Sequence, residues 1–369
     1  MKVLILTVPT GGGHSSAAAA VAEGLRKRGA EVDLYNLYEI VSPIKGALLD
    51  LGYRFATARL PRAYGFFYRG QENRSTNSYT PSARRRKTAK KSKRLKEFID
   101  RGGYDVILFT HIFCGEMLDS IRERHRLTAR VIGIVTDLTL HPYWEEALRI
   151  DNICVACELT AESAEKKGFL PEQILITGIP VSERFYIQRD KRDARTALSL
   201  DENTPTVLIM SGSMGYGNMA RTVRGLDSTL DNVQIICVCG ENKRIKRKIE
   251  RYKTKNRILS LGYTENVDGL MSAADLIITK PGGITLSEAM AKRLPIILYG
   301  EIPGPETHNA RVMTECGAAV RASDTKHLCR LVDWLIKTPS ARDNMKEGFS
   351  RCTRDNAVAT LCSEILKNR

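Results

Sequence analysis

Short apolar runs alternate with stretches of helical spacing through the first half of the chain. The runs lie between turn residues and have the length of buried strands, and the stretches between them suit connecting helices. The first of these helices is expected at Ser15–Arg28. The strands are expected at Val3–Val8, Glu31–Leu34, Val106–Phe109, Val131–Val135 and Ile153–Ala156.

A second alternation of the same kind follows residue 205. Two successive sets of parallel βα units predict the α/β class, with two facing doubly wound Rossmann-like domains. We expect a first domain over 1–181, a linker over 182–204 and a second domain over 205–369, whose last helices could pack back on the first domain. The second set of strands is expected at Thr206–Met210, Val233–Val238, Arg257–Ser260, Leu276–Thr279, Ile296–Tyr299 and Ala318–Val320.

An insertion at 42–96 interrupts the first alternation. It carries Tyr64, Phe66 and Phe67, then polar loop-like sequence, then a run at 84–96 with nine basic residues in thirteen. Aromatic residues followed by cations suit a segment at a membrane interface, and a pair of core helices with a loop explains the aromatics equally well. The candidate membrane cations are Arg84, Arg85, Arg86, Lys90 and Lys91.

The net charge of +15 implies a partner of opposite sign, either an anionic membrane surface or nucleic acid. No helix-turn-helix, zinc or RNA-binding motif accompanies the charge, so we expect anionic lipids and no nucleic acid. A second basic cluster at 243–257 is explained equally well as a solvated helix face.

The cysteines and the first apolar run indicate a cytoplasmic protein. Nine scattered cysteines do not suggest a disulfide framework, so reduced thiols are expected. The first run is short and leads into Gly11-Gly12-Gly13-His14, which suits an active site better than a discarded secretion signal.

The stretch 275–298 carries the strongest chemical signal. It predicts a strand, a glycine turn and a helix, and a phosphate suits such a turn because the helix begins with free N–H groups and a positive dipole end. Glu288, one turn into that helix, suits a ribose diol. The other residues of this stretch that could contact the nucleotide or its phosphates are Lys280, Pro281, Gly282, Gly283 and Thr285.

Three further loops after strands extend this predicted nucleotide site. The loop 211–218 offers backbone N–H groups to a diphosphate through Gly212, Ser213, Gly215 and Gly217. Tyr263 offers an edge to a base, although an ordinary loop is an equal alternative. Glu306 and Asn309 suit sugar hydroxyls.

The residue that could act as a general base in catalysis belongs to the first domain. Gly12 and Gly13 place His14 on a turn at a strand end, where an imidazole can act as a general base near neutral pH; a turn or capping histidine is the alternative. Asp137 either positions His14 or shares its role. His141 and Trp144 follow on the same side, and plain packing is the alternative for Trp144.

The sequence contains no dense cluster of carboxylates or histidines, so we expect neither a metal nor a cofactor. Helix N-termini and backbone donors can stabilise a sugar-diphosphate leaving group, which favours a metal-independent displacement.

Several of these motifs, in this order along nearly the whole chain, resemble the monogalactosyldiacylglycerol synthase and processive diacylglycerol glucosyltransferase family, which is related to the peptidoglycan GlcNAc transferase. They are Gly11–His14, Thr136-Asp137 with His141–Trp144, Gly178–Val181, Lys280–Ala289 and Gly304–Ala310.

The resemblance implies a GT-B fold and inverting transfer of a hexose from a UDP-sugar to diacylglycerol at the cytoplasmic membrane surface. It implies that His14 is the base, that Glu288 binds ribose, and that Glu306 and Asn309 contact the donor sugar. Pro305 stands where the family usually has glutamine, so glucose, galactose and GlcNAc all stay open as donors. Another lipid acceptor, such as a polyprenyl-linked glycan, and a non-catalytic UDP-sugar-binding protein are the alternatives.

Overall fold

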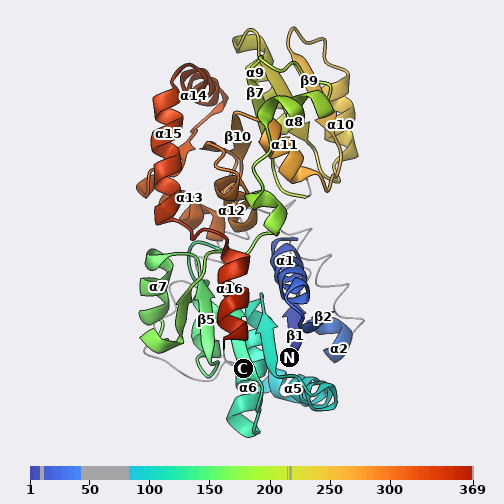
Figure 1. The fold of residues 1–369 in the computed structure, drawn as a ribbon, viewed down its shortest axis with the longest axis vertical. Helices are drawn as coiled ribbons and strands as arrows, with labels where there is room; N and C mark the ends of the chain where they lie inside the picture. Colours follow the sequence, from blue (N-terminus) through green and yellow to red (C-terminus); the bar gives the residue numbers. More distant parts are fainter. Residues whose placement is uncertain (9–11, 43–82, 214, 216–217, 368–369) are drawn as a thin grey trace. The chain divides into compact units, whose positions relative to one another are not determined.

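Every strand pair in the described part of the chain is parallel, as the alternating pattern predicts. The computed structural model describes residues 1–8, 12–42, 83–213, 215 and 218–367. They form two units (Figure 1). The first comprises Met1–Glu183, Pro303–Pro305 and Arg354–Arg369, and the second comprises Arg184–Ile302 and Glu306–Thr353.

The first unit contains a six-stranded sheet of order β2-β1-β3-β4-β5-β6. Its elements are β1 (Lys2–Thr7), α1 (Gly13–Lys27), β2 (Glu31–Asn36), α2 (Leu37–Val41), α5 (Ala83–Gly102), β3 (Val106–Phe109), α6 (Ile112–Arg124), β4 (Arg130–Ile134), the 3₁₀ helix η1 (Pro142–Ala147), β5 (Asn152–Val155), α7 (Glu158–Glu165), η2 (Pro171–Gln173), β6 (Ile174–Ile176) and α16 (Ala357–Leu366).

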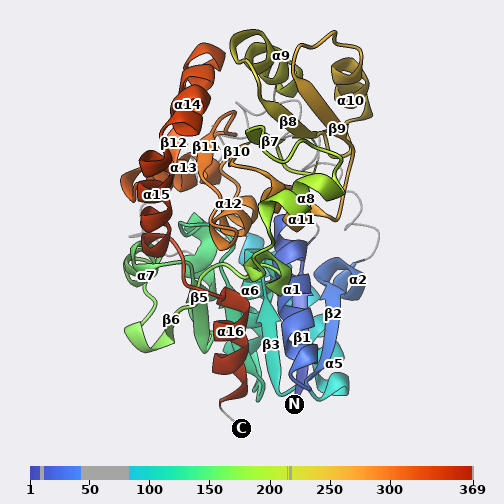
Figure 2. The ribbon, with the colours of Figure 1, turned by 45° about the horizontal axis from the view of Figure 1, so that its top comes forward.

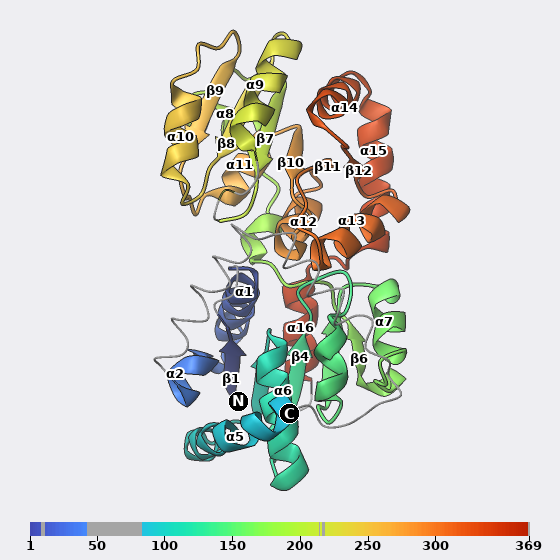
Figure 3. The ribbon, with the colours of Figure 1, turned by 180° about the vertical axis from the view of Figure 1, so that it is seen from behind.

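Helices cover both faces of this sheet. Successive side chains of a strand point to opposite sides, so its apolar residues pack into two cores. Val3 and Ile5 of β1 join the core formed with α1 and α16, whereas Leu4 and Leu6 join the core formed with α5, α6 and η1. Figures 1 and 3 show these two helical layers from opposite sides. The helix from the far end of the sequence therefore completes the core of the first unit.

Helix α1 follows directly from its sequence. Its run of alanines has high helix propensity, and Gly12 precedes it with a φ of 81°. Helix α1 ends at Lys27, and Gly29, two residues further on, has a φ of 81°, a conformation that glycine adopts without strain. The amide of Ala30 donates to the carbonyl of Leu25, which closes the last turn.

The second unit contains another six-stranded sheet, of order β12-β11-β10-β7-β8-β9 (Figure 2). Its elements are η3 (Glu183–Tyr186) at the boundary, α8 (Lys191–Ala197), β7 (Thr206–Met210), α9 (Met219–Thr229), β8 (Gln234–Val238), α10 (Lys243–Glu250), β9 (Arg257–Leu261), α11 (Val267–Ala273), β10 (Leu276–Thr279), α12 (Gly283–Ala291), β11 (Ile296–Leu298), α13 (Pro305–Glu315), β12 (Val320–Arg321), α14 (Thr325–Lys337), α15 (Pro339–Gly348) and η4 (Phe349–Arg351).

Each sheet has one place where the strand order reverses. In the first unit the reversal lies between β1 and β3, and in the second it lies between β7 and β10. The loops that leave the carboxyl ends of such a strand pair diverge, and ligands of open α/β sheets bind in the space between them.

The predicted strands are confirmed, with ends shifted by at most two residues, and β6 is a strand that the pattern missed. The segment 182–204, expected as a linker, contains η3 and α8, and nearly all of it belongs to the second unit. Within the insertion 42–96, Arg84, Arg85, Arg86, Lys90 and Lys91 belong to helix α5, whereas Tyr64, Phe66 and Phe67 lie outside the described residues.

All nine cysteines are buried free thiols. Among the helices that the structure describes, none combines the length and the apolar character needed to cross a bilayer.

The contact between α1 and α16 yields a prediction. A β-carbon at Gly24 would lie 2.5 Å from Cγ1 of Val358 and 3.1 Å from Sγ of Cys362, so Gly24→Leu must push α16 away. We expect a loss of about 1–3 kcal/mol of stability in the first unit, and faster proteolysis within 354–369. Thermal unfolding and timed proteolysis measure the two effects.

Ala19→Leu is the matched control, because Ala19 is exposed on the same helix. An unfolding midpoint of Gly24→Leu equal to that of this control would show that the two helices do not pack closely.

Candidate active site

Three threonines and a histidine gather at the carboxyl ends of β1, β3 and β4. Thr7 ends β1, Thr110 follows β3 and Thr136 follows β4. The hydroxyl of Thr110 donates to the backbone carbonyl of His14 at 3.1 Å and lies 3.0 Å from that of Thr7. Parallel pairing of β1 with β3 therefore brings His14 and Thr110 together at the strand-order reversal of the first sheet.

The tautomer of His14 follows from its hydrogen bonds. Its Nδ1 lies 2.6 Å from the carbonyl oxygen of Thr110 and 3.1 Å from the hydroxyl of Thr136. A carbonyl oxygen only accepts, so Nδ1 of the neutral ring carries the proton and Nε2 carries the free lone pair. A ring in this tautomer is able to accept a proton at Nε2, as a general base does.

The charge state of His14 is set by opposing effects. Burial lowers the pKa of the imidazole, while the negative charge of Asp137 and the hydrogen bond to Thr110 raise it, with burial the largest effect. The net pKa is below the usual value, so the ring is neutral at pH 7. When the ring accepts a proton, the Asp137 carboxylate stabilises the imidazolium electrostatically.

Two residues near His14 were not predicted from the sequence. The ring of His111 packs edge-on against that of His14, with centroids 4.7 Å apart, and its Nδ1 accepts from the amide of Phe113 at the start of α6. Thr110 holds the imidazole of His14 in place through its carbonyl oxygen. Both follow the buried strand Val106–Phe109, but the sequence does not reveal that this strand lies beside β1.

The other candidates of the first unit have structural roles. Gly12 and Gly13 form the turn into α1. Nδ1 of His141 accepts from the amide of Tyr143 and thereby caps η1. Trp144 is buried and stacks on Phe109, with centroids 5.6 Å apart, so this position shows the packing alternative.

In the second unit, the glycine loop after β7 packs on the loop after β8. Gly212 and Gly215 have φ values of 70° and 59°, and a β-carbon at Gly215 would lie 2.2 Å from the carbonyl oxygen of Cys239. The carbonyl of Ser213 accepts from the amide of Glu241 at 2.8 Å. This close backbone approach requires glycine. Gly217 lies outside the described residues.

Lys280 joins this loop to the turn after β10. A β-carbon at Gly212 would lie 3.0 Å from Cε of Lys280, so the loop 211–218 and the turn after β10 meet at this lysine. Its ammonium forms an ion pair with Glu306, whose carboxylate also accepts from the amide of Ile302 at 2.8 Å. Since β7 and β10 flank the reversal of the second sheet, both loops occupy its ligand-binding position.

Helix α12 begins at this turn. Gly282 caps it with extended backbone, and Gly283 is its first residue, so the first N–H groups have no partner within the helix. Thr285 lies in the first turn and is partly exposed. The buried side chain of Asn309 donates to the carbonyl of Pro281 at 3.0 Å and so supports the turn.

Glu288 lies one turn further along α12. Its side chain is half-buried, and burial raises its pKa to about 8; the nearby Asp268 adds to this effect and Arg184 opposes it. The carboxyl group is therefore mostly protonated at pH 7. Tyr263, in contrast, is 66% exposed after β9.

The two halves of the chain match two known families. Residues 14–181 match the model of the monogalactosyldiacylglycerol (MGDG) synthases, and residues 192–349 match that of the glycosyl transferases group 1. The processive diacylglycerol β-glucosyltransferase of Bacillus subtilis (strain 168) is 30% identical over 379 residues, which cover 99% of this chain and 95% of that protein. The protein of the same name from Bacillus licheniformis is 28% identical over 373 residues, which cover 99% and 94%.

The chain belongs to the processive diacylglycerol β-glucosyltransferase family.

Solved structures show that this member of the family has the GT-B fold. The crystal structure of MurG from Acinetobacter baumannii matches with a TM-score of 0.66 and 16% identity over 99% of both chains. MnaA of Staphylococcus aureus, in a co-structure with UDP, matches with a TM-score of 0.63 and 12% identity over 99% of this chain and 95% of that chain. The family that the motifs of this chain predicted is thus confirmed.

The environment of His14 predicts its titration. We expect its pKa to lie below about 6.5, with the Nδ1–H tautomer above it, because burial outweighs the effects of Asp137 and Thr110. Asp137→Asn removes a negative charge and should lower the pKa further. Nuclear magnetic resonance of ¹⁵N-histidine-labelled protein measures both the pKa and the tautomer.

Glu31→Gln is the charge-matched control, since Glu31 is exposed at the amino end of β2 and should leave the titration of His14 unchanged. A parent pKa above 6.5, or one that Asp137→Asn does not move, would contradict this account.

Proposed function

We propose that this protein is an inverting glycosyltransferase that moves a hexose, in the first instance glucose, from a UDP-sugar to the free hydroxyl of diacylglycerol. The observation that carries the proposal is the full-length similarity to processive diacylglycerol β-glucosyltransferases, together with a histidine held in the tautomer of a general base. A β-linked product from an α-linked UDP-sugar corresponds to one inversion at the anomeric carbon.

In the proposed reaction, Nε2 of His14 removes the proton of the acceptor hydroxyl. The oxygen then forms the new bond to the anomeric carbon, while the bond from that carbon to the diphosphate breaks and UDP leaves. The charge of Asp137 supports the positive ring of His14 as the proton arrives.

We place the donor in the second unit. The start of α12, the glycine loop at Gly212 and Gly215, and Lys280 would bind the diphosphate, and Glu288 would accept from the ribose hydroxyls. The hydroxyl groups of the donor sugar would take over Glu306. Lys280, released from this ion pair, would then bind the phosphate. The N–H groups and the ammonium of Lys280 offset the negative charge of the leaving diphosphate, so a metal-independent reaction is part of the proposal.

The proposal also places the enzyme as a peripheral protein on the inner face of the cell membrane. Its support is the chemistry of a lipid acceptor and the basic run at the start of α5, which suits anionic lipids. No nucleic-acid partner is included.

Product analysis tests the function. Protein is incubated with vesicles of diacylglycerol and, separately, UDP-glucose, UDP-galactose or UDP-GlcNAc, and lipid products are identified by mass and by anomeric configuration. We expect a β-glucosyl diacylglycerol. His14→Ala should lower kcat by about 10²–10⁴ while the affinity for UDP stays unchanged, because the base does not contact UDP.

His125→Ala is the matched control, since His125 is exposed at the end of α6 and should leave turnover intact. An α-linked product would refute inversion. Release of a UDP-sugar epimer, or of free UDP without any lipid product, would refute the assignment of diacylglycerol as the acceptor.

The raised pKa of Glu288 predicts that UDP binding depends on pH. Hydrogen bonds from ribose favour the carboxylate, so binding lowers a pKa that is about 8 in the free protein. Between the bound and the free pKa, binding therefore releases a proton, and affinity rises with pH by up to about tenfold per unit until pH 8. Calorimetry in buffers of different ionisation enthalpy counts the protons.

Glu288→Gln should weaken UDP binding and remove its pH dependence below pH 8, whereas Glu347→Gln, at an exposed position of α15, should change neither. Equal proton release by the parent and by Glu288→Gln would exclude Glu288 as the ribose ligand.

A further inference from the structure

A pocket of about 250 Å³ opens in the second unit at the side where β10 and β11 begin. We call it the amino-edge pocket. Asp275 lies just before β10 and Pro295 just before β11, and both line it. Its positive side chains are Arg189, Lys191, Lys292, Arg293, Arg342 and Lys346, against which only Asp275 and Asp343 are negative.

The amino-edge pocket is separate from the donor residues. Strand β10 begins next to Asp275 and ends before Lys280, so the pocket and the donor loop lie at opposite ends of the same strand. A strand of four residues is about 13 Å long. Helix α12 runs the reverse way, from Gly283 in the donor loop to Lys292 and Arg293 in the pocket.

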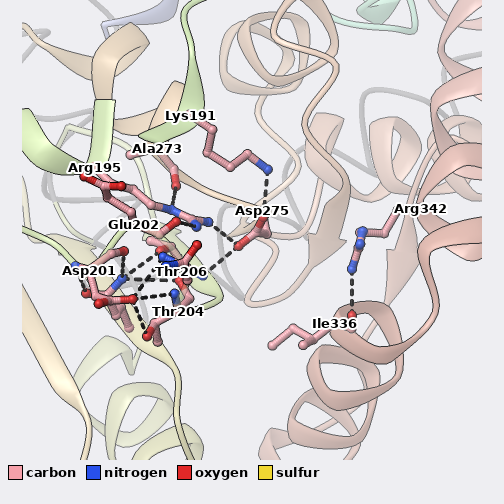
Figure 4. A network of polar contacts seen from close by, with 12 residues as sticks. Lys191, Arg195, Asp201, Glu202, Thr204, Thr206, Ala273, Asp275, Ile336 and Arg342 are labelled. Atoms are coloured by element: carbon pink, nitrogen blue, oxygen red, sulfur yellow. Dashed lines mark hydrogen bonds and ion pairs between the residues drawn. The ribbon is translucent and has the colours of Figure 1, made fainter. Parts of the chain in front are cut away.

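Part of the positive charge is neutralised within the unit. Asp275 binds Lys191 at 2.7 Å and Arg195 at 2.6 Å, and Figure 4 shows both cations directed at this carboxylate. Lys346 pairs with Asp343 at 2.9 Å. Each of these two carboxylates thus has a lysine partner, and the charges of Arg342 and Arg293 also act on Asp343.

Two other cations of the pocket are held by neutral groups. Nη1 of Arg342 donates to the carbonyls of Leu335 and Ile336 at the end of α14, at 2.5 and 2.8 Å, and Figure 4 shows the contact with Ile336. Nζ of the buried Lys292 donates to the carbonyl of Ile187 at 2.6 Å. Carbonyl groups orient a cation without cancelling its charge. In the part of the chain that the structure describes, neither side chain forms an ion pair with a carboxylate.

Arg293 is held at an unfavourable backbone position. Its φ of 52° is left-handed, at the turn that ends α12, where glycine is the usual residue. Its amide donates to the carbonyl of Met290 and closes this turn. A β-carbon is strained in this conformation relative to glycine, yet the chain places an exposed arginine there, beside the pocket.

Burial dominates the titration of Lys292. It lowers the pKa of the amine; the negative charge of Asp268 opposes this change, and the smaller effect of the positive Arg189 adds to it. A bound anion would reverse this effect by favouring the protonated amine.

We propose that the amino-edge pocket binds the phosphate group of a small, soluble phosphate monoester. A dianionic phosphate matches the positive charges of Lys292, Arg293 and Arg342, none of which forms an ion pair with a carboxylate among the residues that the structure describes. Because Arg342 uses only Nη1 for its bonds to carbonyl groups, its other nitrogens can donate hydrogen bonds to the phosphate oxygens. The volume accommodates a phosphate with a few carbon atoms, and the mostly polar walls do not suit acyl chains.

Calorimetry with inorganic phosphate and glycerol 3-phosphate, at constant ionic strength and with saturating UDP, tests the site. Saturable binding with Kd of about 1 mM or tighter is expected. Arg293→Gly should weaken it about tenfold, which is the effect of losing one charge-assisted hydrogen bond. The substitution should leave the affinity for UDP unchanged and should not lower the unfolding temperature, since glycine suits the left-handed turn.

Arg251→Gly removes the same charge at the end of α10, outside the amino-edge pocket, and should leave phosphate binding intact. The proposal is overturned if neither probe binds, if Arg293→Gly binds phosphate as tightly as the parent, or if Arg251→Gly weakens binding equally. Binding to vesicles of anionic phospholipid but to neither soluble probe would overturn it as well.

Discussion

Both candidate halves of the reaction depend on a constraint of parallel sheets. Where the strand order reverses, two neighbouring loops leave the carboxyl ends of their strands in opposite directions, and side chains between them stay accessible. In the first sheet this position holds His14, with Thr110 beneath it. In the second sheet it holds Gly212 and Lys280. The strand pairing that builds each sheet therefore also decides where these candidate residues gather.

Burial acts in opposite directions on the two titratable groups that matter most. It lowers the pKa of the His14 imidazole and raises that of the Glu288 carboxyl, so both are mainly uncharged at neutral pH. In the proposed reaction each group takes up its charge only with its substrate: the histidine when it receives the acceptor's proton, and the glutamate when ribose hydroxyls donate to it. The protein thus avoids holding unpaired buried charges before its substrates arrive.

The sequence predicted the two sets of parallel strands because apolar runs and turn residues are local signals. It missed β6 at Ile174–Ile176, which is short and only half-buried. Glycine turns marked Lys280 and His14 as site candidates, but the partners of these residues depend on which strands are neighbours. Strand order is set by packing between distant segments, so the roles of Thr110 and of the buried Trp144 could not be deduced from spacing.

The first unit is not encoded by one continuous stretch of the gene. Helix α16, at the far end of the polypeptide, contributes Val358, Leu361 and Ile365 to the core beneath α1. A fragment that ends near residue 183 would leave that apolar face uncovered and would tend to aggregate. A chimaera between two relatives must therefore exchange both segments together, or one parent's helix will be packed against the other parent's sheet.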